Sequence, residues 1–450
     1  MSFYTQFISQ FLFPLHEKMK GHETVEKKAL LDESQWFEKI KIQTQQQDRL
    51  VEFLMDIREN NHFYQQLFSE LNLDNNALSQ ADVLTKLPIL TKDIIRANEE
   101  QYLSELSENT IYLSTSGSSG TPLKFAVGNE RISHDVAAKW RATNWWNVDI
   151  GDKEAVIWGS SVELSGQGIV KTLRDVLFRS KLFPAQHLDS KGIADLFARL
   201  SEFKPAMIYG YPSILTLLAE HAKTNGIKFE HTGLKVIFCT AEKLYQHQRD
   251  IIESVFNAPV ANGYGSRDAG FIAHECSEGT LHISEEDVIV EVLNEQNEPC
   301  AIGEIGQLIV TNLTTRDFPM LRYNTGDLAV LSDKKCPCGR QLKVFSEVVG
   351  RSNDMLISTA GGIVHGAYIG NIIREDLAIC HFQLTQLSRI NFSVKLVGYP
   401  DKTIDSLSMI ARLQVVLGED ANIICELVAE IDAESTGKFK YIINQYQPSS

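Results

Sequence analysis

The chain has 450 residues, of which 43% are hydrophobic and 22% are charged. This length predicts two or three domains and a sizeable core, which excludes a disordered chain or a miniature fold held by disulfides. The formal net charge of −15 argues against nucleic acid or an anionic membrane as the main partner, but it allows a local basic pocket for phosphates.

The cysteine pattern and the amino terminus lead us to expect a soluble, cytoplasmic protein. The seven cysteines are an odd number and none precedes Cys239, which is unusual for a secreted disulfide framework. The first residues, MSFYTQFISQFLFPL, lack the positive region of a signal peptide. No stretch approaches about 18 uninterrupted apolar residues, so the sequence predicts no transmembrane helix and no membrane partner.

Residues 1 to about 110 are predicted to be mainly helical. Apolar residues recur with helical spacing in two stripes, namely Phe3, Phe7 and Phe11, and then Leu50, Phe53, Leu54 and Ile57. We expect both stripes to pack in the core. Pro88 in LPILTK (87–92) restricts the preceding residue and marks the end of this region.

In the middle of the chain, short apolar strands alternate with helices. The predicted elements are a helix at 190–200, a strand at 206–210, a helix at 213–226, a strand at 234–239 and a helix at 243–257. This alternation predicts a parallel sheet that is covered on both faces by helices.

From about residue 281 to 349 the pattern changes to strands and turns, and segments 287–299 and 306–313 suggest antiparallel pairing. After Gly350 the sequence continues with βαβ-like segments, which are enough for a small separate domain. We therefore expect a large domain over 1–349 and a small one over 350–450.

The segment YLSTSGSSGTPLKF (112–125) is the most specific motif in the chain. Its glycines allow backbone N–H groups to approach an anion closely, and its hydroxyls and Lys124 add donors for phosphate oxygens. It is not a Walker A loop, because Leu123 and Phe125 flank the lysine. We predict phosphate binding, with a flexible Ser/Gly linker as the alternative.

Two further segments combine a glycine turn with an acid. In NGYGSRDAG (262–270), the Tyr264 ring can stack on a nucleobase and the Asp268 carboxylate can hold Mg²⁺, although an ordinary strand-to-loop turn is the favoured interpretation of this segment alone. In RYNTGDLAVL (322–331), Asp327 is placed to accept hydrogen bonds from ribose hydroxyls, with a capped turn as the alternative.

Two further segments lie nearer the carboxy terminus. VVGRSNDML (348–356) places Arg351 and Asp354 where the composition changes, which fits an interdomain hinge or a surface loop. In STGKFK (435–440), Lys438 and Lys440 follow a glycine, and a solvated tail is the alternative for this pair.

A separate set of four residues predicts a zinc site. Cys276 and His282 are followed, after a long loop, by Cys336 and Cys338 in a C-P-C-G turn. Three thiols and an imidazole can complete a tetrahedral zinc site with no open position, which favours a structural role. Buried free thiols with a surface histidine are the alternative.

In their order and spacing, TSGSSGTPLK, YGSRDAG, RYNTGD, GRSNDML and TGK resemble the motif series of the adenylate-forming (ANL) superfamily. LPILTK (87–92), YGYPS (209–213) and CPCGR (336–340) resemble its phenylacetate-CoA ligase branch, and above all the CapK-like, or coenzyme F390 synthetase-like, members. The resemblance begins near residue 87. It implies an α/β fold with parallel sheets flanked by helices, a β-rich subdomain at about 281–349, and a small mobile α+β carboxy-terminal domain.

The resemblance implies ATP-dependent activation of a carboxylic acid to an acyl-adenylate with release of pyrophosphate, followed by transfer of the acyl group to CoA or another thiol. ATP, Mg²⁺ and a structural Zn²⁺ are the implied cofactors. An amine acceptor, a catalytically degenerate nucleotide-binding scaffold and a homodimer remain open alternatives. Aromatic residues in the middle of the chain permit an aryl or other apolar acid, although most are expected in the core: Trp145, Trp146, Trp158, Tyr209 and Tyr211.

The same resemblance assigns roles around the nucleotide. The loop over the β- and γ-phosphates comprises Ser116, Gly117, Ser118, Ser119, Gly120, Thr121 and Lys124. The segment against adenine comprises Thr240, Ala241 and Glu242, with Tyr264 and Gly265 stacking nearby.

The remaining roles concern charge at the reacting groups. Asp268 matches an acid associated with Mg²⁺, and Asp327 with Arg351 matches the ribose-binding pair. Lys438 matches the mobile lysine that reaches the reacting carboxylate and the α-phosphate. This chain departs from the superfamily at Arg267–Asp268, where Thr-Glu is usual, and at Asn353, where an acid is usual.

Overall fold

The structure is a computed structural model. It describes residues 2–105, 107, 110–115, 123–158, 174–185, 190–231, 233–351, 355–376, 378–399, 402–431 and 440–446. The chain divides into a large unit, Met1–Thr325 with Ala329–Val348, and a small unit, Gly326–Leu328 with Val349–Ser450.

The amino-terminal part of the large unit is helical, as predicted. Its helices are α1 (Phe3–Phe7), the π-helix η1 (Ile8–Leu12), α2 (Phe13–Met19), α3 (Thr24–Ser34), α4 (Lys39–Asn60), α5 (His62–Glu70), α6 (Asn75–Leu78), the 3₁₀-helix η2 (Val83–Lys86), α7 (Lys92–Ala97) and α8 (Glu99–Tyr102). Side chains at several N-caps accept a bond from the first turn, for example Asn61 from the Tyr64 N–H and Thr91 from the Ile94 N–H.

Of the two predicted apolar stripes, one is buried and the other is exposed. Phe53, Leu54 and Ile57 on α4 are fully buried in the main core, which confirms that prediction. The prediction for Phe3, Phe7 and Phe11 is wrong, because these side chains are exposed. The helix packs instead through its opposite side, where residues such as Thr5, Ile8 and Phe13 are buried. The spacing identified the helix but not the face that would pack.

One sheet of eleven strands runs through the large unit, in the order β10-β11-β12-β13-β9-β8-β7-β6-β5-β3-β4. Its strands are β3 (Glu154–Trp158), β4 (Ser180–Pro184), β5 (Met207–Gly210), β6 (Val236–Thr240), β7 (Val260–Ser266), β8 (Gly270–Glu275), β9 (Leu281–Ile283), β10 (Val288–Leu293), β11 (Ile305–Asn312), β12 (Met320–Ser332) and β13 (Val344–Arg351).

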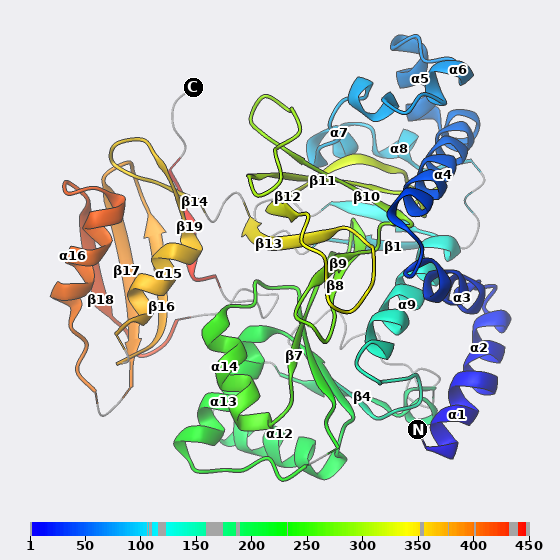
Figure 1. The fold of residues 1–450 in the computed structure, drawn as a ribbon. Helices are drawn as coiled ribbons and strands as arrows, with labels where there is room; N and C mark the ends of the chain where they lie inside the picture. Colours follow the sequence, from blue (N-terminus) through cyan, green and yellow to red (C-terminus); the bar gives the residue numbers. More distant parts are fainter. Residues whose placement is uncertain are drawn as a thin grey trace. The chain divides into compact units, whose positions relative to one another are not determined.

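From β4 to β7 the neighbouring strands are parallel, and helices cover both faces of this half. The covering helices are α9 (Asn129–Asn144), α12 (Ser190–Phe203), α13 (Pro212–Thr224) and α14 (Gln246–Phe256). Consecutive residues of β6 point to opposite faces of the sheet and enter different clusters. Ile237 lies beneath α12–α14, and Phe238 lies beside Trp146, which follows α9. Figure 1 shows α13 and α14 on one side of β7 and α9 on the other. The predicted doubly covered parallel sheet is therefore confirmed.

Beyond β7 the sheet continues with antiparallel pairs at β7–β8, β8–β9 and β9–β13. The strands predicted within 287–299 and 306–313 are β10 and β11, and they pair antiparallel. The predicted β-rich region is thus the continuation of the same sheet. A separate hairpin, β1 (Ile111–Ser114) with β2 (Lys124–Val127), pairs Ser114 with Lys124.

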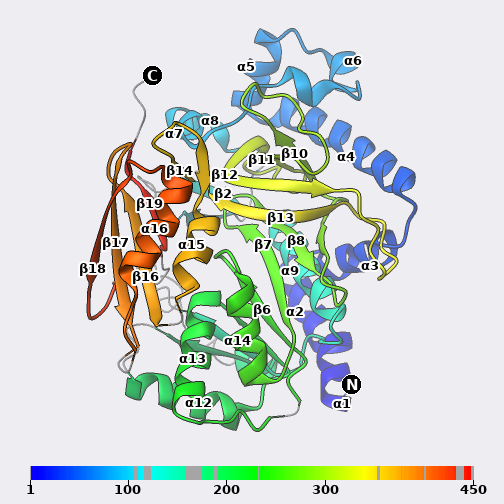
Figure 2. The same cartoon turned by 60° about the vertical axis from the view of Figure 1, so that its left-hand side comes forward.

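The small unit contains a four-stranded sheet in the order β18-β17-β16-β19 and a two-stranded hairpin. Its elements are β14 (Met355–Ile357), β15 (Ile363–His365), α15 (Gly366–Arg374), β16 (Ile379–Gln386), β17 (Asn391–Gly398), α16 (Ser406–Leu417), β18 (Asn422–Leu427) and β19 (Ile442–Asn444). β17 and β18 are parallel and joined through α16, which is the predicted βαβ arrangement. Figure 2 shows α15 and α16 beside this sheet, where Ile373, Met409 and Leu413 fill its core.

No helix in the described part of the chain is long and apolar enough to span a membrane.

Truncating Phe53 to alanine should lower the free energy of unfolding by about 3–5 kcal/mol, because a buried ring is replaced by a cavity. Ile40→Ala on the same helix is the matched control, since Ile40 is exposed, and it should cost less than about 0.5 kcal/mol. Urea unfolding measures both. Equal losses in the two variants would contradict the assignment of the buried face of α4.

Candidate functional site

Three of the predicted motifs meet at the carboxylate of Asp268. The turn after β7 places this side chain in the interior, where Tyr323 of β12 donates its hydroxyl to Oδ2 at 2.5 Å. The Lys92 Nζ lies 3.6 Å from the same oxygen. YGSRDAG, RYNTGD and LPILTK therefore converge, although they are far apart in the sequence.

Backbone pairing explains why LPILTK reaches this site. The Leu90 N–H donates to the Arg322 carbonyl at 2.9 Å, and the Asn324 N–H donates to the Leu90 carbonyl at 2.8 Å. Leu90 therefore lies beside Tyr323 as a short parallel bridge. Two residues later α7 begins at Lys92, so the lysine points from the first turn of a helix that is fixed against β12.

Glycine is required on both sides of the turn that carries Asp268. A Cβ on Gly265 would lie 2.4 Å from the Gly270 carbonyl oxygen, and Gly270 itself has φ +94°. The β7–β8 register also shifts between Tyr264 and Gly265. This close hairpin turns the acid inward, which an ordinary side chain at either glycine would prevent.

Arg131 of α9 holds the same turn from behind. Its guanidinium donates to the carbonyl oxygens of Arg267 and Asp268 at 3.2 and 3.1 Å, and its Nε donates to Asp135 at 2.8 Å. From the other side, Asn312 of β11 donates to the Ala269 carbonyl at 3.0 Å. The backbone of the turn is thus fixed by buried side chains from two different elements.

The surroundings of Asp268 keep it ionised. Burial alone raises the pKa of its carboxyl, but the Lys92 ammonium and the hydroxyls of Ser266 and Tyr323 outweigh burial and hold the pKa below its ordinary value. A buried carboxylate with a fixed negative charge is suited to face a cation or a hydrogen-bond donor.

The predicted adenine segment lies at the end of β6. Thr240 is buried, and Ala241 adopts φ +66°, which turns the chain sharply after the strand. The Glu242 carboxylate accepts a bond from the Ser213 N–H at 3.1 Å, in the first turn of α13. Tyr264 lies two residues before the end of the neighbouring β7, with its ring centroid 6.2 Å from that of Phe345. These residues share the carboxyl edge of parallel strands, where ligands bind in such sheets.

The other predicted residues are only partly described. The phosphate loop, Ser116–Thr121, lies outside the described residues. Of the residues that flank it, the Leu123 N–H donates to the Thr115 hydroxyl at 2.9 Å. Lys124 follows on β2 and is exposed. Asp327 is half-buried on β12, and the backbone of Arg351 ends β13. Lys438, Asn353 and Asp354 lie outside the described residues.

The predicted zinc ligands lie together. Cys276 Sγ and Cys336 Sγ are 3.6 Å apart, and Cys338 Sγ is 3.4 Å from His282 Nε2. All four ligand atoms lie within 4.8 Å of one another. A turn closed by the Gly279 N–H on the Cys276 carbonyl carries the first ligand, and one closed by the Gly339 N–H on the Cys336 carbonyl carries the other two thiols.

The side chains around these ligands are also fixed. The Arg340 guanidinium lies over the rings of Trp36 and Trp145, 4.7 and 4.4 Å from their centroids. Gln35 accepts bonds from both Arg340 and Trp145. Burial, assisted by the nearby Arg340, lowers the pKa of His282 to about 4, so its imidazole is neutral at pH 7 and has a lone pair to offer.

The aromatic residues of the middle region separate into two places. Trp158, Tyr209 and Tyr211 lie at the carboxyl ends of β3 and β5, with the rings of Trp158 and Tyr211 centred 4.2 Å apart. Trp145 instead packs edge-on against His282, and Trp146 donates to the Glu275 carbonyl. The two neighbouring tryptophans therefore belong to the surroundings of the Cys/His cluster.

Comparison with known proteins agrees with the motif series. The CapK C-terminal domain family matches residues 356–445. Protein CapK of Staphylococcus aureus is 28% identical over 414 residues, 89% of this chain and 88% of that protein. A phenylacetate-coenzyme A ligase of Thermus thermophilus is 24% identical, covering 70% of this chain and 72% of that protein. These matches bear out the resemblance of the chain to the adenylate-forming superfamily, in its phenylacetate-CoA ligase and CapK-like branch.

A solved structure with the same fold is 2-hydroxyisobutyryl-CoA ligase in its postadenylation state. It superposes with a TM-score of 0.75 at 20% identity and covers 91% of each chain. The shared fold covers 91% of this chain, so it includes part of the helical region that precedes LPILTK.

Sequence reasoning missed three residues of the site. Lys92 was included in a branch motif without a role, and Tyr323 was passed over beside Asp327. Arg131 had one available signal, because it forms an i,i+4 pair with Asp135 on α9. Their contacts with Asp268 and its turn come from segments distant in the sequence.

The Arg131–Asp135 pair predicts a pH dependence of stability. Burial alone raises the pKa of the Asp135 carboxyl, but Arg131, with His134 and the Phe271 N–H, lowers it to about 2. A carboxyl with a lowered folded pKa stabilises the protein above its unfolded pKa of about 4 and loses this effect as the pH falls through 2. Asp135→Asn should therefore lose on the order of 2 kcal/mol at pH 7, and the gap from wild type should narrow below pH 4.

Urea unfolding at several pH values measures this gap. Glu59→Gln is the control, because Glu59 is an exposed carboxylate on α4, and it should stay within about 0.5 kcal/mol of wild type. A gap for Asp135→Asn that does not change between pH 7 and pH 3 would refute the ionic contribution.

Proposed function

We propose that this protein is an ATP-dependent ligase that activates a carboxylic acid as its acyl-adenylate, releases pyrophosphate and passes the acyl group to CoA or another thiol. The observation that carries the proposal is the buried, ionised Asp268 in the turn after β7, at the carboxyl edge of the parallel strands. β7 also carries Tyr264 and pairs with β6, which leads into the Thr240–Glu242 segment. The names of the relatives and the shared fold support the same reaction class.

The first half-reaction brings two anions together, since a carboxylate oxygen attacks the α-phosphorus of ATP. Positive charge must then be positioned at the transferring group and at the leaving pyrophosphate. Lys438 is the candidate for the α-phosphate, and Lys124 together with backbone amides of 116–121 is the candidate for the leaving group. Mg²⁺ bound with ATP would supply further charge next to Asp268.

The nucleoside is proposed to bind along the strand ends. Tyr264 offers a ring face to adenine, and the backbone of Thr240 to Glu242 offers polar groups to its edge. The Glu242 carboxylate already accepts a hydrogen bond from the first turn of α13. It would therefore hold the Thr240–Glu242 segment in place as well as line the proposed adenine site. Asp327, with Arg351, is the candidate partner of the ribose hydroxyls.

The acceptor is proposed to be CoA, in line with the ligases among the relatives. An amine acceptor remains the second candidate for the second half-reaction. A degenerate scaffold that only binds nucleotide is the non-enzymatic alternative, and the retained Lys124, Asp327 and Lys438 argue against it.

Acid-dependent exchange of labelled pyrophosphate into ATP, run across a panel of aryl and aliphatic acids, tests the first half-reaction. Mass spectrometry with CoA and with amines then identifies the second product. Formation of AMP supports the proposal, whereas ADP would indicate phosphate transfer instead. Tight ATP binding without exchange for any acid would favour the scaffold alternative.

If Lys438 binds charge that develops in the transition state, Lys438→Ala should slow adenylate formation by about 10²–10³-fold and change ATP affinity little. Lys440→Ala is the matched control two residues away and should keep near-normal exchange. Wild-type exchange in Lys438→Ala, or an equal loss in Lys440→Ala, would sink the assignment.

We also propose that Cys276, His282, Cys336 and Cys338 hold one structural Zn²⁺. In a tetrahedral site, zinc bonds of about 2.3 Å to sulfur and about 2.0 Å to nitrogen put ligand atoms roughly 3.5–3.8 Å apart. The distances of 3.6 and 3.4 Å fit this spacing. Four protein ligands leave no position for substrate, so the ion would join the turn after β8 to the loop before β13.

Elemental analysis should find about one zinc per chain, as expected for a four-ligand site. Cys338→Ser should lose the metal and lower the melting temperature strongly, because structural zinc contributes on the order of 10 kcal/mol to folding. Cys300→Ser is the control, since Cys300 is a free thiol outside the cluster, and it should keep the zinc. A wild-type protein that is fully stable without metal would contradict the zinc site, and the four residues would then be ordinary core residues.

A further inference from the structure

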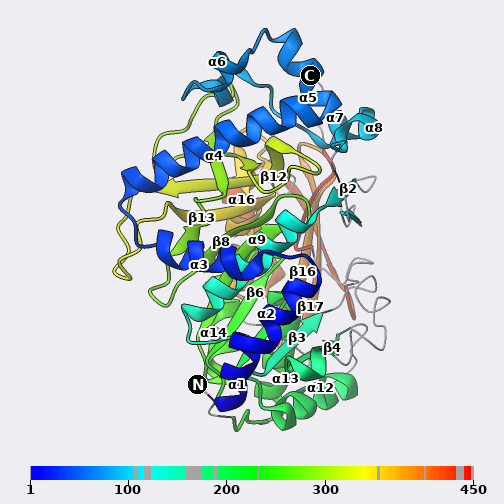
Figure 3. The same ribbon diagram turned by 90° about the vertical axis from the view of Figure 1, so that its right-hand side faces the viewer.

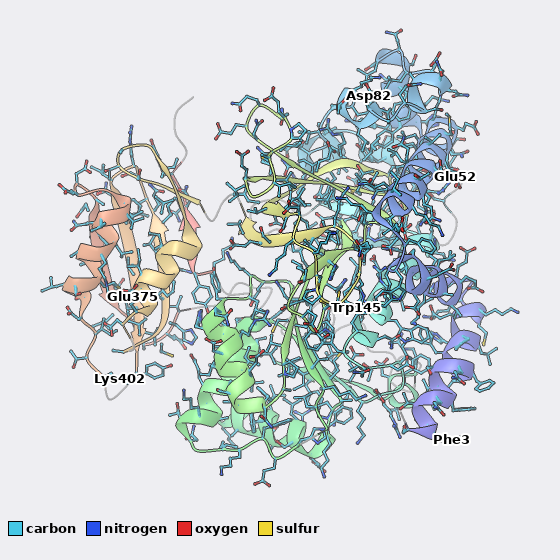
Figure 4. The ribbon with its side chains drawn as sticks, viewed as in Figure 1. Phe3, Glu52, Asp82, Trp145, Glu375 and Lys402 are labelled. Carbon is cyan, nitrogen blue, oxygen red and sulfur yellow. The ribbon has the colours of Figure 1, made fainter. Side chains whose placement is uncertain are left out.

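The first seventeen helical residues expose a row of apolar side chains along one side. α1, η1 and α2 follow one another without a break from Phe3 to Met19. Five side chains at every fourth position, between 48% and 85% exposed, form what we call the apolar stripe: Phe3, Phe7, Phe11, Leu15 and Met19. The rings of Phe7 and Phe11 stack on each other with centroids 6.0 Å apart. Figure 3 shows these helices in front, and Figure 4 labels Phe3 near their amino-terminal end.

The opposite side of this helical segment is firmly packed. The Thr5 hydroxyl donates to Asp152 at 2.8 Å, and the Phe13 ring meets Trp140 edge-on at 5.2 Å. Glu17 is buried and accepts bonds from several side chains of the same region. The segment is therefore held in one orientation, and the apolar stripe is the side that this orientation presents outward.

The π-helix keeps the stripe on one side. In a regular α-helix, positions four apart rotate by about 40° at each step, so a row from Phe3 to Met19 would wind roughly 160° around the axis. A π-helical turn takes more residues than an α-helical one, and the turn at Ile8–Leu12 reverses part of this drift. Such turns are uncommon and occur often at functional sites. The π-helical turn and the exposure of the stripe thus both indicate a functional surface.

The area of the apolar stripe matches the requirement of a dimer. Side chains of this size and exposure present roughly 600 Å² per copy, so two copies would bury on the order of 1,200 Å². Val176 and Leu177 extend the surface beside Tyr4, whose hydroxyl donates to the Leu177 carbonyl at 2.8 Å. A continuous apolar patch of about 600 Å² is at the upper end of what monomeric proteins expose, and such patches often mark interaction sites.

We propose that the apolar stripe is the interface with a second copy of this chain, with two stripes packed antiparallel about a twofold axis at Phe11. The spacing is symmetric about this residue, so Phe3 would meet Met19 of the second copy and Phe7 would meet Leu15. No charged residue occurs from Ser2 to Leu15, so two copies can approach without opposing charges. The net charge of −15 disfavours an anionic membrane as the occupant.

Sedimentation velocity over a concentration series tests the interface. The wild-type protein should be a dimer, and Phe7→Glu with Phe11→Glu should raise the dissociation constant by at least about 100-fold, as expected at the centre of an interface. Val415→Glu is the control, because Val415 is equally exposed on α16, and it should leave the dimer intact. A monomeric wild type, a dimer that survives the double substitution, or binding of the wild type to neutral lipid vesicles as a monomer would overturn the proposal.

Cysteine cross-linking tests the antiparallel arrangement. Under mild oxidation, Phe11→Cys should form a disulfide-linked dimer, whereas Phe3→Cys alone should not exceed the wild-type background. A mixture of Phe3→Cys and Met19→Cys should cross-link strongly. Cross-linking of Phe3→Cys to itself, with none in the mixture, would indicate a parallel arrangement and contradict the proposed axis.

Discussion

Burying the ionised carboxylate of Asp268 costs several kcal/mol of desolvation unless opposite charge and hydrogen-bond donors face it. Tyr323 and Lys92 meet this requirement, and they come from β12 and from the first turn of α7. Because Leu90 pairs with the backbone beside Tyr323, the amino-terminal helices, the parallel half of the sheet and its antiparallel half are joined at one charge. The candidate nucleotide site is built around this group.

The same principle governs the two regions that flank it. All three nitrogens of the Arg131 guanidinium donate hydrogen bonds, two of them to carbonyls of the Asp268 turn and one to Asp135. A lysine ammonium lacks this planar arrangement of donors and would not hold the turn in the same way. At the Cys/His cluster, Arg340 lies between two tryptophans and fixes the turn that carries two thiols. In both places a buried or stacked arginine positions a loop that regular secondary structure does not reach.

The amino-terminal helices show how an apolar stripe can serve two purposes. On α4 the stripe fills the main core, whereas from Phe3 to Met19 an equally regular stripe remains outside because Thr5, Phe13 and Glu17 hold the other side against the large unit. In both cases the spacing of apolar residues correctly predicts a helix and identifies its apolar side. Which side packs depends on partners such as Asp152 and Trp140, which lie far along the chain.

The sequence by itself indicated the resemblance to the superfamily, the helical start, the alternating parallel half, the β10–β11 pair and the members of the Cys/His cluster, because these depend on local periodicity, turn residues and ordered motifs. Only the tertiary structure decided that the β-rich region continues the same sheet, that Lys92 and Tyr323 face Asp268, that Trp145 belongs with His282, and that Phe3, Phe7 and Phe11 stay exposed. Each of these is a contact between residues distant in sequence, and local spacing carries no information on which distant surface a side chain will meet.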